Sequence, residues 1–158
     1  MHPRMSQLVL DARNVAILRA LGEDPRISIS ALARRVGLSA PAVRERVQRL
    51  EEEKVIAGYR LEVSPQALGY PIAVFVRIRP MPGKLPKIIE LAERMPQVVE
   101  CHRITGEDCF ILKLYIEALE ALDRILDRFL AYGQTTSTLV QSTPVPPRSL
   151  PLPGEARG

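Results

Sequence analysis

Arginine is concentrated in one short stretch of the chain, residues 32–50, which holds five arginines and a single acid, Glu45. The pattern predicts a helix that ends at Val36, a turn at Gly37 and a second helix opened by Ser39. Guanidinium groups bind phosphates and the edge of guanine, so this stretch is equipped to contact a nucleic acid. Two short helices joined by a glycine turn are typical of a helix-turn-helix, whose second helix enters the DNA major groove.

Spacing decides which side of the second helix is free. Val43, Val47 and Leu50 recur at i, i+4 and i+7 and therefore form one buried stripe. The other side, the helix start and the preceding arginines are left to face DNA. The predicted DNA-binding residues are Arg34, Arg35, Ser39, Ala40, Pro41, Arg44, Glu45, Gln48 and Arg49.

Roles within this set follow from side-chain chemistry. Arg44 and Gln48 can hydrogen-bond base edges, and Ser39 with the first N–H groups of the helix can bind a phosphate. Further phosphate contacts are expected from Arg34, Arg35 and either Arg46 or Arg49. The alternative interpretation is that these arginines are only the solvated side of an amphipathic helix.

Charge is distributed unevenly between the two halves of the chain. The net charge is +4, of which residues 1–64 carry +3 (eleven Arg and Lys against eight acids). Residues 65–143 are neutral, with nine charges of each sign. A basic front half is the footprint of a phosphate-binding surface, and a neutral rear half is suited to protein contacts.

The sequence argues against several classes of protein. A chain of 158 residues has room for one ordinary domain or two small ones. No apolar run has the length of a membrane span and the start has no hydrophobic signal region, so we expect no membrane association and a cytoplasmic location. With only Cys101, Cys109, His2 and His102 available, we expect reduced thiols, no metal site and no cofactor.

The front of the chain predicts a small winged helix-turn-helix domain over residues 1–63. Asp11 is expected to cap a first helix that ends at Leu21, with Gly22 as its stop and Val15, Leu18 and Leu21 facing inward. Ser28 should cap the second helix. The alternating residues of 55–63 predict a short strand, possibly a wing.

After a hinge at residues 64–71 the pattern changes to that of a ferredoxin-like βαββαβ domain over 72–143. The fold class is therefore α+β. Strands are expected at 72–79, 98–105, 109–115 and 135–143, with a helix between the prolines at 82 and 96 and another around Leu119–Phe129. The proline-rich tail, residues 144–158, predicts an extended or disordered arm.

Both helices of such a domain cover one face of the sheet. The strands at 72–79 and 109–115 carry apolar residues on both faces, so the uncovered face should also be buried, most simply against a second copy of the chain. We therefore expect a dimer.

Taken together, these features resemble the Lrp/AsnC family, also called feast/famine regulators, over about residues 8–143. The front signature is residues 10–11, 26–28, 35–39, 45–47, 49–51 and 56–59, and the rear signature is residues 101–102, 105–106 and 112–113. The resemblance implies a cytosolic, sequence-specific DNA-binding transcriptional regulator, a dimer that assembles into a tetramer or octamer. It also implies a small-molecule effector, an amino acid or related metabolite, which alters assembly or DNA binding. The effector residues that it implies are Thr105, Gly106, Glu107, Asp108, Gln134, Thr135 and Thr136.

Side-chain chemistry is compatible with that effector site. Carboxylates such as Glu107 and Asp108 could bind an ammonium group, while the Gly106 N–H and the threonines could bind a carboxylate. The alternative is an ordinary hairpin turn. Two positions depart from the family: Cys109 stands where many members have a ligand-binding aspartate, and Lys54 stands where a glycine usually ends the recognition helix.

Two other functions were compared with the regulator. Some tetrapyrrole (siroheme-type) decarboxylases resemble the same two-part fold, but only His102 and Arg103 are available for such chemistry and the recognition helix keeps its arginines, so we predict no enzyme. The other alternative is an architectural protein that binds DNA with little sequence choice.

Overall fold

The computed structural model describes residues 10–155, and these divide into two compact units. The first contains residues 10–61 together with 145–155, and the second contains residues 62–144. The residues predicted as a hinge, 64–71, are part of the second unit, whereas the described part of the tail groups with the first. His2 and the last three residues of the tail lie outside the described range.

The first unit consists of three helices with capped starts: α1 (Ala12–Glu23), α2 (Ile29–Val36) and α3 (Ala40–Glu52). The predicted caps are confirmed: the side chains of Asp11, Ser28 and Ser39 each accept a hydrogen bond from a backbone N–H three residues later. Gly37 ends α2 at φ 67°, a left-handed conformation that glycine adopts without steric cost.

The predicted end of α1, Leu21, is two residues too early. The helix continues through Gly22 to Glu23 and is capped by Asp24, whose N–H donates to the Ala20 carbonyl at 3.0 Å. An added Cβ at Gly22 would meet no atom within 4 Å, so this glycine lies on an open side of the helix. Gly22 therefore lies within the helix and does not terminate it.

The core of the first unit is small and lies among the three helices. Leu18 and Leu21, predicted to face inward, pack against this core, but the fully buried positions of α1 are Ile17 and Ala20. Val15, also predicted inward, is only partly buried. The buried hydrophobic residues are Ile17, Ala20, Leu32, Ala33, Val36, Val43 and Leu50.

The predicted strand over residues 55–63 does not form in the single chain. Residues 57–64 have no regular structure, and the side chains of Tyr59, Leu61 and Val63 are 55%, 84% and 49% exposed. A strand needs a neighbouring strand for its hydrogen-bond ladder, and no described residue of the chain provides one here. The alternating residues thus form an exposed apolar segment that pairs with no strand of residues 10–155.

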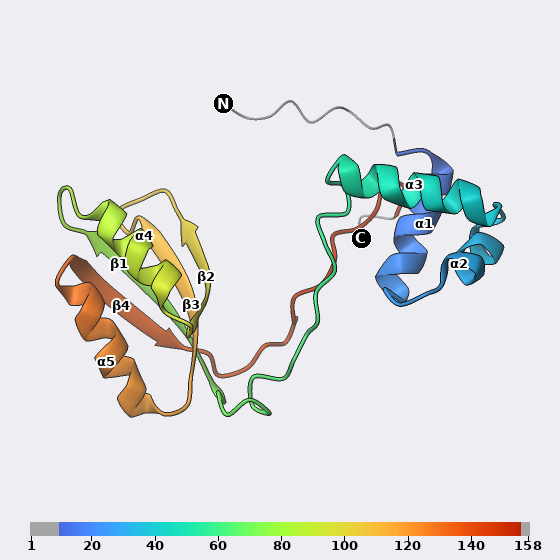
Figure 1. The fold of residues 1–158 in the computed structure, drawn as a ribbon. Coiled ribbons are helices and arrows are strands. Elements are labelled where there is room, and N and C mark those ends of the chain that lie inside the picture. The colour runs from blue at the N-terminus through green and yellow to red at the C-terminus, as the bar shows by residue number, and fades with distance from the viewer. Residues whose placement is uncertain (1–9, 156–158) are drawn as a thin grey trace. The chain divides into compact units, whose positions relative to one another are not determined.

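The second unit is an α+β domain with the predicted βαββαβ order. Its strands are β1 (Ile72–Pro80), β2 (Val98–Arg103), β3 (Phe110–Ile116) and β4 (Gly133–Leu139), and its helices are α4 (Leu85–Arg94) and α5 (Leu119–Leu130). The strands form an antiparallel sheet in the order β2-β3-β1-β4, and both helices cover the same face (Figure 1). The strands predicted at 98–105 and 135–143 end earlier, at Arg103 and Leu139.

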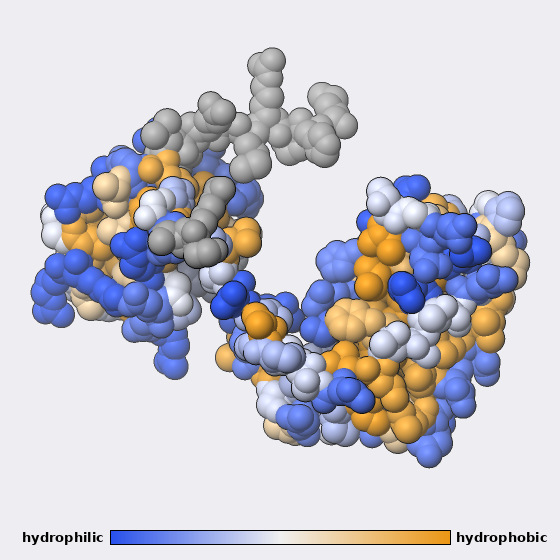
Figure 2. Space-filling view, turned by 180° about the vertical axis from the view of Figure 1, so that it is seen from behind, coloured by the Kyte–Doolittle hydropathy of each residue, from blue (hydrophilic) through white to orange (hydrophobic). Residues whose placement is uncertain are grey.

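The two faces of this sheet differ. On the helix-covered face Val74, Val76 and Ile78 of β1 are fully buried and join a core with residues of β3, α4 and α5. On the opposite face Phe75, Arg77 and Arg79 are exposed. Figure 2 looks at the second unit from the side opposite α4 and shows hydrophobic residues over much of that surface.

Candidate nucleic-acid interface and effector site

The outer side of α3, its N-cap and the last turn of α2 carry the residues predicted to contact DNA. Val43 and Leu50 are fully buried and Val47 partly so, which fixes the rotation of the helix. The predicted contact residues are accordingly exposed, except Ala40, which is half-buried. Five of them line a shallow depression of about 320 Å³: Ala40, Pro41, Arg44, Glu45 and Gln48.

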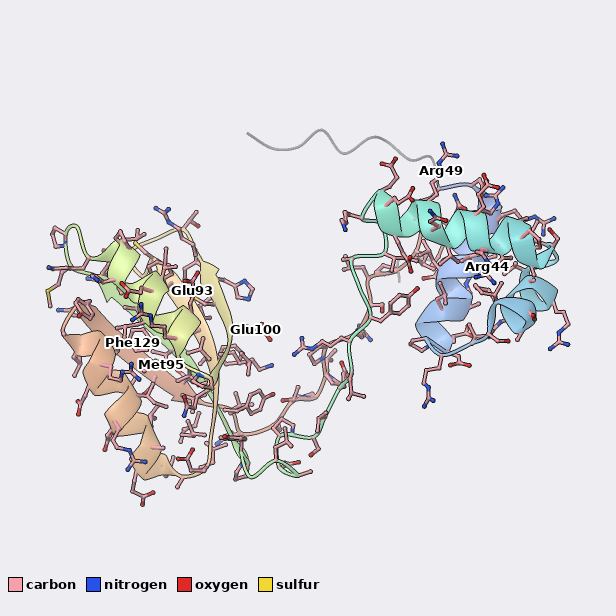
Figure 3. The ribbon with its side chains drawn as sticks, in the orientation of Figure 1. Arg44, Arg49, Glu93, Met95, Glu100 and Phe129 are labelled. Carbon is pink, nitrogen blue, oxygen red and sulfur yellow. The ribbon has the colours of Figure 1, made fainter. Side chains whose placement is uncertain are left out.

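Not all of these polar side chains are equally available. Within residues 10–155, Arg34, Arg44 and Arg49 form no ion pair with another side chain, and Arg49 projects from α3 (Figure 3). Arg35 pairs with Glu23, and the Gln48 side chain donates to Glu52 Oε1 at 2.8 Å. The last two contacts are exposed and therefore weak enough to exchange for contacts with DNA.

Arg46 has a different place from the other arginines of α3. Its Nη1 donates to Asp11 Oδ2 at 2.8 Å and to Asn14 Oδ1 at 2.9 Å. The hydrogen bond from the Asn14 N–H, and then the Arg46 guanidinium, hold the pKa of Asp11 below its ordinary value. Arg46 thus fastens α3 to the start of α1, and of the two alternatives for the phosphate contact the geometry favours Arg49.

Two further side chains of α1 position the helix-turn-helix and were not predicted. Arg13 Nη1 donates to the Val36 carbonyl at 2.5 Å, at the end of α2. Asn14 is the one buried polar residue within the described part of the chain. Its position three residues before Ile17 puts it on the buried side of α1, a signal that the sequence does contain.

The turn between β2 and β3 holds the first group of predicted effector residues. It is closed by a hydrogen bond from the Ile104 N–H to the Cys109 carbonyl at 2.8 Å, and Gly106 lies at φ 112°, where a side chain would be strained. Glu107 is exposed and Asp108 is half-buried. The turn therefore presents its acids at the end of the sheet.

The second group lies at the start of β4, and the register separates its members. Gln134 pairs with Arg79 and Thr136 with Arg77, which places both on the uncovered face. Thr135 pairs with the buried Ile78 and so lies on the helix-covered face. Gln134 and Thr136 therefore share a surface, and Thr135 does not join them.

Two arginines of β1 connect the turn to this surface and were missed by the sequence reasoning. Arg77 Nε lies 3.8 Å from Asp108 Oδ2, and Arg79 Nε lies 3.9 Å from Asp108 Oδ1. Arg79 also pairs through Nη2 with Glu107. The alternation Val76-Arg77-Ile78-Arg79 signalled two arginines on one face of a strand, but not what they meet.

Gly133 brings β4 close to β1 beside this cluster. A Cβ added there would lie 2.5 Å from the Arg79 carbonyl oxygen, which is closer than atoms can approach without a shift of the backbone. The position therefore requires glycine for packing, since its φ is not in the left-handed region.

A groove of about 390 Å³ lies elsewhere on the second unit, between α4 and β2, where Figure 3 labels Glu93 and Glu100. Its lining is mostly apolar and includes Cys101, but none of the predicted effector residues. Burial, and then the charge of Glu93, raise the pKa of the Cys101 thiol, so it stays protonated and is a poor nucleophile.

Two further features are absent from residues 10–155. No group of three or more His, Cys, Asp or Glu side chains there is arranged to hold a metal ion. No helix in the same range is long and apolar enough to cross a membrane.

The comparison with known proteins decides the family. Residues 10–51 match the AsnC-type helix-turn-helix domain, and residues 73–150 match the Lrp/AsnC ligand binding domain. The chain belongs to the Lrp/AsnC family. The family resemblance of its short motifs is thereby confirmed over both units.

Individual Lrp/AsnC proteins are similar over nearly the whole chain. The HTH-type transcriptional regulator LrpC of Bacillus subtilis is 32% identical over 133 residues, which cover 84% of this chain and 92% of that protein. Among solved structures, a Neisseria meningitidis transcriptional regulator in complex with L-methionine superposes with a TM-score of 0.84 at 25% identity, covering 91% of this chain and 97% of the other. A Mycobacterium tuberculosis feast or famine regulatory protein complexed with L-methionine gives 0.79 at 32% identity, covering 89% and 98%.

Membership of the Lrp/AsnC family fixes the broad function. The relatives are transcriptional regulators with a helix-turn-helix, and this chain is a DNA-binding transcriptional regulator of the same kind. The tetrapyrrole decarboxylase alternative is set aside, because these similar proteins are regulators and not enzymes.

Proposed function

We propose that the chain is a regulator that reads duplex DNA with the outer side of α3 and whose assembly or DNA binding responds to an amino acid. One observation carries the first part: Val43 and Leu50 are fully buried, so the arginines of α3 other than Arg46 face solvent. A rigid helix with an apolar side held by two others is the arrangement that enters the major groove.

The polar side chains of this surface divide into base contacts and phosphate contacts. Arg44 and Gln48 make the base contacts, because they line the central depression of the exposed side. Arg34, Arg35 and Arg49 bind phosphates, and the N-terminal end of α3 at Ser39 adds a backbone phosphate site. Gln48 first releases Glu52, and Arg35 releases Glu23.

A symmetric dimer presents two copies of α3 to successive major grooves of a pseudopalindrome. Its support is the exposed apolar surface on the uncovered sheet face, with Phe75 at 37% exposure, and on the segment with Tyr59 and Leu61. Dimers assemble further into a tetramer or octamer that wraps DNA. Because it binds DNA, the protein is located in the cytoplasm.

The effector is an α-amino acid held by the β2–β3 turn and the start of β4. The support is chemical: carboxylates of the turn suit an ammonium group, and two similar proteins were solved with L-methionine. The residues proposed are Thr105, Gly106, Glu107, Asp108, Gln134 and Thr136, and Thr135 is left out because it lies on the opposite face.

The DNA proposal is tested by fluorescence anisotropy with the full chain. A binding site selected from a random duplex pool is compared with unselected duplex across a salt series. We expect selective binding whose affinity falls as salt rises. Equal affinity for both duplexes would favour the architectural alternative, and no binding at low salt would overturn the proposal.

The effector proposal is tested by a thermal-shift screen against the twenty amino acids. A ligand held by the native state raises the melting temperature by mass action. Light scattering with and without the best ligand then reports the oligomeric state. The effector part fails if none of the twenty raises the melting temperature at millimolar concentration.

A further inference from the structure

Two arginines on the uncovered face of β1 hold the turn that carries Glu107 and Asp108. Arg79 pairs with Glu107 and its Nε lies 3.9 Å from Asp108, while Arg77 lies 3.8 Å from Asp108. The arginine side chains are about half exposed, at 51% and 49%. In the single chain the guanidinium groups are therefore within reach of a dissolved ligand, and ligand binding there requires that this end of β1 stays open when the uncovered face meets a second copy.

The sheet order puts these arginines between the two groups of effector residues. β1 lies between β3, which follows the turn, and β4, which carries Gln134 and Thr136. Arg79 is the register partner of Gln134, and Arg77 is that of Thr136. A ligand that touches both groups of one chain must lie across β1, over these two side chains.

The charges of the cluster balance. Arg77 and Arg79 carry two positive charges, and Glu107 and Asp108 carry two negative ones. A zwitterion has one group for each sign and leaves this balance unchanged. A ligand with only a carboxylate, or only an ammonium group, displaces one partner and leaves its charge without a counterpart.

The two acids are not equally easy to release. Glu107 is 82% exposed and follows Gly106 in a turn, whereas Asp108 is 31% exposed and lies near both arginines. An exposed ion pair contributes little stability, so the Glu107–Arg79 pair opens readily. Asp108 stays as the anchor of the turn.

We infer that Arg79 binds the carboxylate of the effector, which takes the place of the Glu107 carboxylate, and that the released Glu107 binds the effector's ammonium group. The planar guanidinium donates two parallel hydrogen bonds to a carboxylate, which the ammonium group of a lysine cannot do. Arg77, paired with Asp108, keeps the turn in position. The site thus selects compounds that carry both charged groups. This inference rests on the proposed amino-acid effector.

The experiment uses the full chain and isothermal titration calorimetry. The probes are the amino acid with the largest effect among the twenty, its methyl ester and its N-acetyl derivative. Wild type should bind the free amino acid at least about ten-fold more tightly than either derivative, because each lacks one charged group.

Variants assign the two roles. Arg79→Ala should weaken binding of the free amino acid by about ten- to a hundred-fold, and Arg79→Lys by less. Glu107→Gln should weaken binding of the free amino acid but not that of the N-acetyl derivative. Arg94→Ala is the matched control, since Arg94 is an exposed arginine of α4 that pairs with Glu90 at 3.1 Å, and it should bind as wild type does.

The outcomes separate this inference from the proposal on which it rests. If Arg79→Ala binds the amino acid as tightly as wild type, or if the methyl ester binds as tightly as the free acid, Arg79 is not the carboxylate partner although the effector site stands. If wild type binds none of the twenty, the effector proposal itself fails. The comparison of ester with free acid needs no variant, so a folding defect in Arg79→Ala leaves the test intact.

Discussion

The Arg46 guanidinium lies 2.8 Å from the Asp11 carboxylate, so an ion pair joins the middle of α3 to the N-cap of α1. Asp11 at the same time accepts the Asn14 N–H at 2.7 Å. One carboxylate therefore both caps the first helix and binds the recognition helix.

Asp11→Ala should lower the free energy of unfolding by about 0.5–2 kcal/mol, because it removes the cap. The pKa of Asp11 is lowered in the folded chain, so its contribution is present above the ordinary value of 3.8 and is lost as pH falls through the lower folded-state pKa. Urea unfolding of both proteins at several pH values should thus show a difference that shrinks in acid. Asp11→Asn, which keeps a good cap, is the control, and a loss as large as that of alanine would assign the effect to the ion pair instead.

Arg44→Ala should weaken binding to the preferred duplex by about 1–3 kcal/mol and relax its sequence preference. The matched variant is Arg49→Ala, which should weaken binding to all sequences alike and reduce the salt slope by about 1. Anisotropy titrations over a salt series measure both. Unchanged affinity and preference in Arg44→Ala would remove this residue from base recognition.

Lys54→Gly should raise the free energy of unfolding by about 1 kcal/mol. Lys54 follows α3 at φ 58° and is the one residue other than glycine with positive φ in the described part of the chain. Its N–H donates to the Glu51 carbonyl at 3.0 Å, so the left-handed turn is part of the helix end. Lys54→Ala, which keeps the strain, is the control in thermal unfolding, and equal melting temperatures for the glycine and alanine variants would contradict the explanation.

Gly133→Ala should destabilise the second unit and loosen the pairing of β1 with β4. The added methyl group would lie 2.5 Å from the Arg79 carbonyl oxygen, and the contact is with backbone, which cannot swing away as a flexible side chain can. Hydrogen exchange of the β1 and β4 amides should increase relative to wild type. Gly22→Ala, where a Cβ meets nothing within 4 Å, should show no such loss.

The helices and the order of the strands could be predicted because their signals are local. The starts of the three helices are marked by their N-cap residues Asp11, Ser28 and Ser39, and α2 ends at the predicted Gly37. The apolar spacing of Val43 and Leu50 gave the exposed side of α3 correctly. Each of these signals acts over a few residues, so no knowledge of the tertiary structure is needed.

The contacts that cross between elements could not be predicted in the same way. Arg46 belongs to α3 by spacing but meets Asp11, 35 residues earlier, and Arg79 meets Glu107, 28 residues later. The alternating apolar pattern predicts a strand at 55–63, yet a strand also needs a partner strand, which local sequence does not specify. The predicted effector set includes Thr135 together with Gln134 and Thr136. The side chains of a strand alternate between faces, so Thr135 lies on the other face.

The exposed apolar segment with Tyr59, Leu61 and Val63 has a consequence for the thermal stability of this protein. An 84% exposed leucine, beside Tyr59 and Val63, leaves apolar surface in water that a second copy would cover. Association favours the folded form by mass action, so dilution should lower the melting temperature. Thermal stability then depends on the protein concentration more than on the fold of a single molecule.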